Sequence, residues 1–144
     1  MHKAVYDFNQ SRNNFELDMD LEIRMLKEEV QEFFAAKSLA ERIDAIIDVD
    51  YVWQGTKMKC LNDMTLPAAS LVEFIDKFLK MAMAIVIKEL PSGITIDEAM
   101  VFAGKTVVRC NAAKGTTKDA DGKINKENFG LDATAEIQAW LDGK

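Results

Sequence analysis

The sequence predicts an all-α protein, an antiparallel helical bundle of about four to five helices in a single domain. Apolar residues recur at three- and four-residue steps over long stretches, which is the spacing of one face of a helix. The Ser/Thr-x-x-Glu pattern of helix starts precedes three of these stretches, and the alternation typical of strands is almost absent. A chain of 144 residues, 49% of them apolar, is long enough for one hydrophobic core and too short for two.

The first expected helix spans Leu17 to Ala36, because its apolar residues share one helical face. They are Leu21, Met25, Leu26, Val30, Phe33 and Phe34. Ser38 and Glu41 form a capping-box pattern, in which each side chain satisfies a free backbone N–H at the helix start. A second helix is therefore expected from Leu39 to about Lys59. The connection around Lys37 is so short that the two helices should form an antiparallel hairpin.

A third helix is expected from a second capping-box pattern, Ser70 to Glu73. It should end at Leu90, before the helix breakers Pro91 and Gly93. Its apolar residues are expected to form core or a subunit interface; they are Phe74, Phe78, Met81, Met83, Ile85 and Ile87.

The rest of the chain predicts two more helices and a loop. Thr95 to Glu98 is the third capping-box pattern, and it should start a helix that runs through about Ala113. The stretch Thr116 to Gly130 is polar and rich in turn residues, which indicates a loop or a short hairpin arm. A last short helix is expected over Ala133 to Leu141.

Composition and charge exclude several function classes. The chain has 18 Lys and Arg against 24 Asp and Glu, and a net charge of −6 argues against a surface that neutralises nucleic-acid phosphates. Its two cysteines, Cys60 and Cys110, lie far apart and lack a Cys or His at metal-ligand spacing, so neither a disulfide framework nor a zinc site is indicated. The longest apolar run, Met81 to Ile87, is too short to cross a bilayer, and the N-terminus lacks an apolar signal core. We expect a cytoplasmic protein that binds neither nucleic acid nor membranes.

Two groups of carboxylates lie on the first two expected helices. Glu28, Glu29 and Glu32 occur within the strongly apolar first helix, and Asp44 and Asp48 share one face of the second. A short connection brings the two groups together, where like charges repel and partial burial adds a desolvation cost. Clustered oxygen ligands without Cys or His favour a hard cation, Mg²⁺ or Mn²⁺.

The alternative is that these carboxylates are only the solvated faces of two helices, which is the usual role of charged helical residues. Asp44 and Asp48 favour the metal site, because they interrupt the apolar segment Ile43 to Val52. Glu41 is interpreted as structural, since it matches the capping-box position. Five residues could contact a base, but the core is the preferred interpretation for them; they are Phe8, Asn9, Phe15, Tyr51 and Trp53.

These elements resemble the MazG-like all-α nucleoside triphosphate pyrophosphohydrolases, a superfamily that includes phosphoribosyl-ATP pyrophosphohydrolases and dimeric dUTPases. Glu28-Glu-Val-Gln-Glu32 matches the EExxE element of that family. In the second element, ExxD, Asp48 matches the Asp, but Ala45 occupies the Glu position and Asp44 looks like the substitute. Asp44-Ala-Ile-Ile-Asp48-Val-Asp-Tyr51, followed by Gly55-Thr56, is similar to the DxxxDxxY pattern of the phosphoribosyl-ATP-pyrophosphohydrolase-like branch.

A later stretch adds to the resemblance. Val108-Arg-Cys-Asn111-Ala-Ala-Lys114 looks like the V-x-x-S-N-x-x-K stretch of this branch, and Asp121 to Lys126 is similar to the Gly-Lys-rich segment that follows it. The chain also departs from the family pattern. The segment near residues 60–93 is longer than the family core and is expected to be a helical insertion, and the Pro-containing ending is absent.

The resemblance implies a Mg²⁺-dependent pyrophosphohydrolase that converts a ribo- or deoxyribonucleoside triphosphate and water into a monophosphate and pyrophosphate. It implies a metal site of four carboxylates: Glu29, Glu32, Asp44 and Asp48. Glu28 is the candidate that orients or deprotonates the water. Lys114, with Arg109 or Lys105 as a helper, would offset charge on the polyphosphate, and Asn111 would hydrogen-bond phosphate or sugar. The family assembles as dimers or tetramers, so a homodimer or homotetramer with a site completed between subunits is expected.

Two other function classes compete with this interpretation. An all-α oligomeric module that binds nucleotide or metal without hydrolysis is favoured by Ala45 at the usual Glu position. A di-iron carboxylate bundle is disfavoured, because the chain's single histidine, His2, is not part of a Glu-x-x-His pair. The preferred base and sugar, the number of metal ions and the identity of the general base have no sequence signal.

Overall fold

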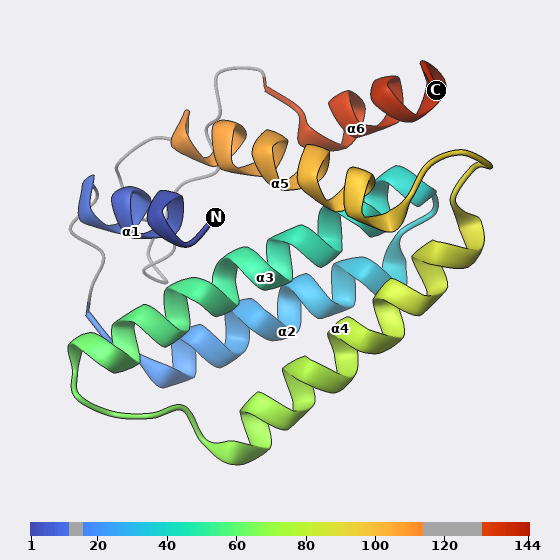
Figure 1. Ribbon diagram of the computed structural model, residues 1–144. Coiled ribbons are helices and arrows are strands. Elements are labelled where there is room, and N and C mark those ends of the chain that lie inside the picture. The colour runs from blue at the N-terminus through green and yellow to red at the C-terminus, as the bar shows by residue number, and fades with distance from the viewer. Residues whose placement is uncertain (12–15, 114–130) are drawn as a thin grey trace.

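The computed structural model describes residues 1–11, 16–113 and 131–144, and these ranges contain helices and no strands (Figure 1). The all-α class is therefore confirmed. The described residues form six helices: α1 His2–Ser11, α2 Met19–Ala35, α3 Leu39–Asn62, α4 Ala69–Glu89, α5 Ile96–Ala112 and α6 Ala133–Asp142. The expected number was too low because α1 was not predicted.

The α2–α3 hairpin forms as expected, with both helix starts capped by side chains. Asp18 accepts a hydrogen bond from the backbone N–H of Leu21 at 3.2 Å, and Ser38 accepts one from that of Glu41 at 3.1 Å. The Glu41 carboxylate accepts from the N–H of Lys37 at 2.9 Å, one residue before the position that a capping box requires. This contact supports the structural interpretation of Glu41.

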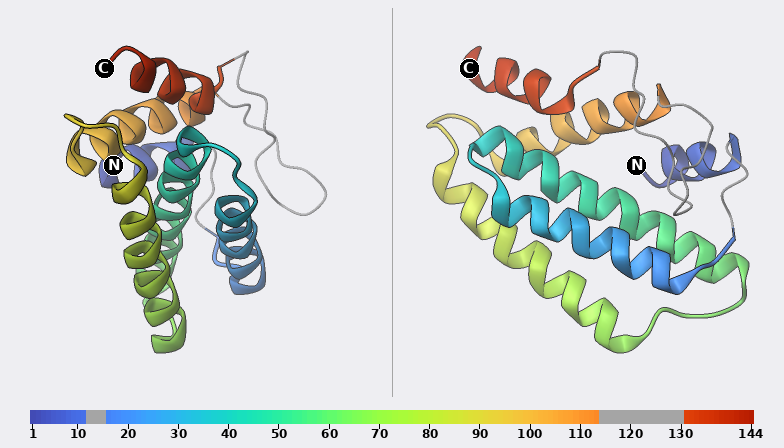
Figure 2. Two further views of the ribbon diagram at one scale, coloured as in Figure 1. Left: turned by 90° about the vertical axis from the view of Figure 1, so that its right-hand side faces the viewer. Right: turned by 180° about the vertical axis from the view of Figure 1, so that it is seen from behind.

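Helix α3 is the centre of the fold. It packs against each of the other five helices. In Figure 1, α2 and α4 lie below α3, and α1, α5 and α6 lie above it, whereas the left view of Figure 2 shows α2 and α4 apart from each other. Its apolar side chains are therefore buried over most of its circumference, with Ile43 and Val49 fully buried. Polar residues on α3 have few exposed positions and must find partners between helices.

Helix α4 begins differently from the prediction. Its N-cap is Ala68, which makes no side-chain capping bond, and the N–H groups of Leu71 and Val72 already bond the Ala68 carbonyl, at 3.0 and 3.1 Å. Ser70 therefore lies inside the first turn and cannot be the cap, because an N-cap residue has extended backbone angles. The capping box predicted at Ser70 was wrong, whereas the box of Thr95 and Glu98 at α5 is confirmed with both hydrogen bonds present.

Helix α4 contributes to the core rather than lying outside it. Ile75, Ala82 and Val86 are fully buried, and α4 packs against α3 and α5. The ring of Phe78 also meets Phe33 of α2 edge-on, with centroids 5.4 Å apart. That residues 60–93 are an insertion relative to a family core stays a prediction.

An exposed apolar patch lies where α2 and α4 meet. Phe34 is 63% exposed, and its ring centroid is 6.1 Å from that of the buried Phe78. Phe74 and Met81, which precede and follow Phe78 on α4, are 46% and 39% exposed. We call Phe34, Phe74 and Met81 the Phe34 patch. Large apolar side chains gathered on a surface in this way are typical of contact sites.

Helix α1 packs on α3 and α5, and its residues Val5 and Asn9 are both buried. It approaches α3 at Gly55, where an added Cβ would lie 3.4 Å from Asn9 Nδ2 and 3.7 Å from Val5 Cγ1. The apolar spacing of Val5 and Phe8 is helical, but a capping residue is lacking and a polar residue, Asn9, faces the core. These two features explain why α1 was not predicted.

A buried ion pair joins α2 to α3 near the open end of the hairpin. Lys59 Nζ lies 3.1 and 3.3 Å from the two carboxylate oxygens of Glu22, and these two residues are 4% and 1% exposed. The hydroxyl of Thr56 lies 3.2 Å from Glu22 Oε1 and 3.1 Å from the carbonyl of Val52, so it can donate to either. None of the helices described in the structure is both long and apolar enough to cross a membrane.

We expect Lys59→Ala to lower the free energy of unfolding by about 3–5 kcal/mol, because it leaves the Glu22 carboxylate buried without its cation. Urea unfolding followed by circular dichroism measures this change. Lys80→Ala removes an exposed lysine of α4 and should cost less than about 0.5 kcal/mol.

The double variant Glu22→Leu/Lys59→Met separates the ion pair from the volume that it fills. Both charges are removed and the space stays occupied, so most of the lost stability should return. A loss in Lys59→Ala no larger than that in Lys80→Ala would contradict the importance of the pair.

Candidate metal centre

Three carboxylates from the first helical hairpin converge between α2 and α3. One oxygen atom from each of Glu29, Glu32 and Asp48 lies within 4.8 Å of the other two. Glu29 and Asp48 are half-buried, and Glu32 is exposed. Glu29 and Glu32 are three residues apart on α2, and the antiparallel hairpin brings Asp48 of α3 beside them. The structure thus brings together three of the four predicted metal ligands.

The donor set fits a hard divalent cation. All three groups are carboxylates, and the separations are close to those of ligands around one ion, since opposite oxygens on Mg²⁺ lie about 4.2 Å apart. Carboxylate oxygens without nitrogen or sulfur suit Mg²⁺ or Mn²⁺ better than zinc.

The same helix interface also holds a carboxylate whose charge is neutralised by the chain itself. Glu22 lies two turns before Glu29 on α2 and is paired with Lys59. At the level of Glu29, three acidic groups meet instead. Like charges held together in partly buried surroundings repel, so a cation bound there would stabilise the arrangement.

Asp44 lies outside the three-carboxylate group. It precedes Asp48 by one helical turn on α3, and its Oδ2 accepts a hydrogen bond of 2.8 Å from the hydroxyl of Thr134 on α6. Its other carboxylate oxygen, Oδ1, is buried, as is Oε2 of Glu29. The predicted set of four therefore divides into three grouped carboxylates and one that is hydrogen-bonded to α6.

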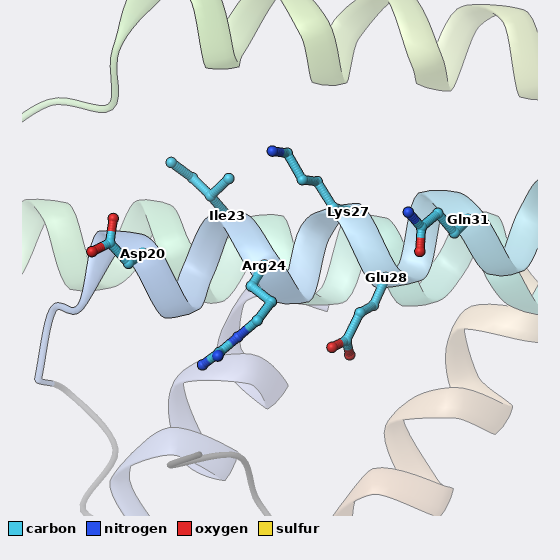
Figure 3. Close-up of a pocket in the computed structure, with 6 residues that line it drawn as sticks. All are labelled: Asp20, Ile23, Arg24, Lys27, Glu28 and Gln31. Atoms are coloured by element: carbon cyan, nitrogen blue, oxygen red, sulfur yellow. The ribbon is translucent and has the colours of Figure 1, made fainter.

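Glu28 lines an open hollow on the surface of α2, which has a volume of about 430 Å³ (Figure 3). Arg24 and Glu28 point to the same side of the helix, whereas Ile23 and Lys27 point to the other side (Figure 3). The described residues that line it are Asp20, Ile23, Arg24, Lys27, Glu28 and Gln31. Arg24 was not a predicted site residue, and it places a positive group beside Glu28.

The predicted phosphate contacts lie on and after α5. Asn111 is buried in the last turn of that helix, and Lys105 is exposed. Arg109 donates a hydrogen bond from Nη2 to Glu136 Oε1 of α6 at 2.7 Å, and this contact raises the pKa of the Arg109 guanidinium. Lys114 and the segment Asp121–Lys126 lie outside the described residues.

Cys110 lies on α5 between Arg109 and Asn111 in the sequence, and its surroundings disfavour the thiolate. Burial raises the pKa of its thiol, and the nearby carboxylates of Glu136 and Asp44 raise it further, against a smaller opposing effect from Arg109. The Sγ atom is 3.6 Å from Glu136 Oε2. A protonated, buried thiol is neither a good nucleophile nor a ready metal ligand.

The core interpretation is confirmed for the aromatic residues that follow Asp48. Tyr51 and Trp53 are buried, and the ring of Tyr51 meets that of Phe8 edge-on, with centroids 5.7 Å apart. Asn9 is buried as well, and Phe15 lies outside the described residues.

Thr134 had no sequence signal as a site residue. It lies in the first turn of α6, where a threonine is common for local reasons, and it is 90 residues from Asp44. Only the packing of α6 against α3 brings the two together.

Comparisons with protein-family models, with curated proteins and with solved structures each find no match.

We expect Glu32→Gln to raise the thermal midpoint of the metal-free protein by about 2–4 °C. The change removes one of three neighbouring negative charges. Two unit charges about 4 Å apart in water repel by about 1 kcal/mol, which corresponds to a few degrees in the midpoint. Differential scanning calorimetry in EDTA measures the midpoint. Asp76→Asn makes the same change of charge at an exposed position on α4 and should leave the midpoint within about 1 °C.

Added Mg²⁺ or Mn²⁺ should then raise the midpoint of the wild-type protein and of Asp76→Asn, because an ion that binds only the folded state stabilises it. Glu32→Gln should show a much smaller increase. Equal increases in all three proteins would contradict a cation site at these carboxylates.

Proposed function

We propose that this chain is a Mg²⁺-dependent nucleoside triphosphate pyrophosphohydrolase. It would convert a ribo- or deoxyribonucleoside triphosphate and water into the monophosphate and pyrophosphate. The observation that supports this most is the convergence of Glu29, Glu32 and Asp48, because these residues belong to the two motifs on which the family resemblance rests.

The three grouped carboxylates are the proposed ligands of the cation, Mg²⁺ or Mn²⁺, and Asp44 is the fourth acidic group of the site. A bound divalent ion would withdraw charge from the phosphate oxygens and lower the pKa of bound water. Glu28 is the proposed group that orients or deprotonates the attacking water. Attack at the α-phosphorus breaks the bridge to the β-phosphate, so pyrophosphate leaves and the new oxygen stays on the monophosphate.

The polyphosphate needs positive groups besides the cation, since the protein carries a net charge of −6. Lys114 is the proposed phosphate contact, and Asn111 and Arg109 are proposed as further substrate contacts. Arg24 is an additional candidate, because it lines the same hollow as Glu28 (Figure 3). An Arg in such a position can donate two parallel hydrogen bonds to a phosphate.

A second candidate function is a non-catalytic module that binds a nucleotide or a metal ion. Ala45 favours it, because this residue occupies the usual Glu position and is only 3% exposed. A glutamate there would bring a charge into the core at considerable cost. In the proposed site the fourth acidic group is therefore Asp44, whose carboxylate accepts a hydrogen bond from Thr134 of another helix.

The enzyme is tested by incubating the purified protein with ribo- and deoxyribonucleoside triphosphates and phosphoribosyl-ATP, with and without Mg²⁺. Metal-dependent release of monophosphate and pyrophosphate, separated by ion-exchange chromatography, is the expected result. Glu32→Gln and Asp48→Asn should each lower the rate by more than about 100-fold, since even the loss of a residue behind a metal ligand costs 10–100-fold. Asp76→Asn should retain the wild-type rate.

Two results would contradict this function. Release of orthophosphate instead of pyrophosphate would show a different reaction. Lack of turnover across the panel, in protein shown by circular dichroism to be helical, would favour the non-catalytic module.

We also propose that the chain forms a homodimer or homotetramer through the Phe34 patch. Exposed aromatic side chains of this size are typical of subunit interfaces. The free, buried cysteines suit a reducing compartment, so the proposed location is the cytoplasm.

The assembly is tested by light scattering after size exclusion. The wild-type protein should have two or four times the chain mass of 16.2 kDa, and Phe34→Ser/Phe74→Ser should shift it toward 16.2 kDa. Val101→Ser, which changes an exposed apolar residue of α5, is the control and should keep the wild-type mass. A monomeric wild-type protein would contradict the proposed interface.

A further inference from the structure

A hydrogen bond joins the C-terminal helix to the acidic region of the hairpin. Thr134 Oγ1 donates to Asp44 Oδ2 at 2.8 Å, and both residues are half-buried. The remaining oxygen of the carboxylate, Oδ1, is buried. Because one oxygen is bound to α6 and the other is enclosed by protein, the rotation of the Asp44 side chain is restricted.

The position of Thr134 is set by the packing of α6. Ile137 and Leu141 are buried against the rest of the core, and the ring of Trp140 stacks on Phe102 of α5, with centroids 4.8 Å apart. Helix α6 thereby lies against α3 and α5. This packing places the hydroxyl of Thr134, in the first turn of α6, at a fixed position against α3.

The Thr134 hydroxyl is not needed to start its own helix. Asp132 is the N-cap of α6, and its side chain accepts from the N–H of Ala135 at 3.1 Å. The next acidic residue, Glu136, binds Arg109 and Cys110 instead of Thr134. Capping therefore does not account for the Thr134 hydroxyl, and its described partner is the Asp44 carboxylate.

We propose that Thr134 is a positioning residue that holds the Asp44 carboxylate in a fixed orientation, as a fourth acidic group beside the three grouped carboxylates of the cation site. This inference rests on the proposed function, since it assigns a role in the same site. Asp44 lies one turn before Asp48 on α3, so its orientation decides whether a fourth negative charge faces the ion. Residues that hydrogen-bond a metal ligand fix its direction, and their loss weakens metal binding about 10–100-fold.

The test is Mn²⁺ binding to the full chain, measured by isothermal titration calorimetry and by the loss of the free-ion electron paramagnetic resonance signal. Thr134→Val keeps the shape of the side chain and removes the donor, and it should raise the dissociation constant for Mn²⁺ about tenfold or more. Thr134→Ser restores the hydroxyl and should bind within about twofold of the wild-type protein.

Thr106→Val is the matched control. It also removes a hydroxyl from a packed helix, but that hydroxyl donates to the carbonyl of Phe102 on the same helix, at 2.9 Å. Wild-type affinity in Thr134→Val would overturn the inference. So would an equal loss in Thr106→Val or a failure of Thr134→Ser to rescue, because either result would indicate a general effect on packing.

The wild-type titration separates this inference from the proposed function. If the wild-type protein binds Mn²⁺ and Glu32→Gln binds it much more weakly, the cation site stands and the Thr134 variants test the positioning role alone. If the wild-type protein binds no Mn²⁺, the proposed cation site fails, and the role of Thr134 fails with it.

Discussion

The ion pair between Glu22 and Lys59 is the interaction on which the geometry of the hairpin depends. Helices α2 and α3 share a long apolar interface, and apolar contacts alone tolerate small shifts of one helix along the other. A buried carboxylate with an ammonium group at 3.1 Å does not tolerate such a shift, because sliding would leave both charges buried and separated. The pair thus sets the alignment that places Asp48 beside Glu29 and Glu32.

The interface between α2 and α3 carries two different arrangements of charge within a few turns. At the open end, one carboxylate is neutralised by a lysine of the same chain, and the result is structural. Nearer the connecting turn, three carboxylates meet, and their arrangement costs energy that the fold must supply. Proteins commonly keep such locally unfavourable groups where a ligand will bind, while the surrounding structure holds them in place.

The sequence predicted the local features of the fold better than the distant ones. Helical periodicity located five of the six described helices, and the cap of Ser38 and the box of Thr95 were readable because they involve residues three apart. The three-carboxylate group was readable for a similar reason, since a short turn forces its two helices together. Helix α1 was missed because its pattern was weak. The cap of α4 was wrong because the helix starts two residues earlier than expected, after Ala68 instead of Ser70.

The remaining features depend on contacts that no short pattern encodes. The pairing of Glu22 with Lys59 spans 37 residues, and that of Asp44 with Thr134 spans 90. Lys59 resembles an ordinary charged residue near a helix end, and its burial follows only from the position of α3 at the centre of the bundle.

The separation of 90 residues between Asp44 and Thr134 also has a consequence for synthesis in the cell. A ribosome that adds about 5–20 residues per second takes roughly 5 to 20 seconds to proceed from Asp44 to Thr134. During that interval the nascent hairpin can already fold, but Asp44 lacks its hydroxyl donor and the face of α3 that receives α6 is uncovered. The acidic region therefore acquires its final form late in translation, and a message interrupted before the codons of α6 would yield a chain with the hairpin carboxylates but without that constraint.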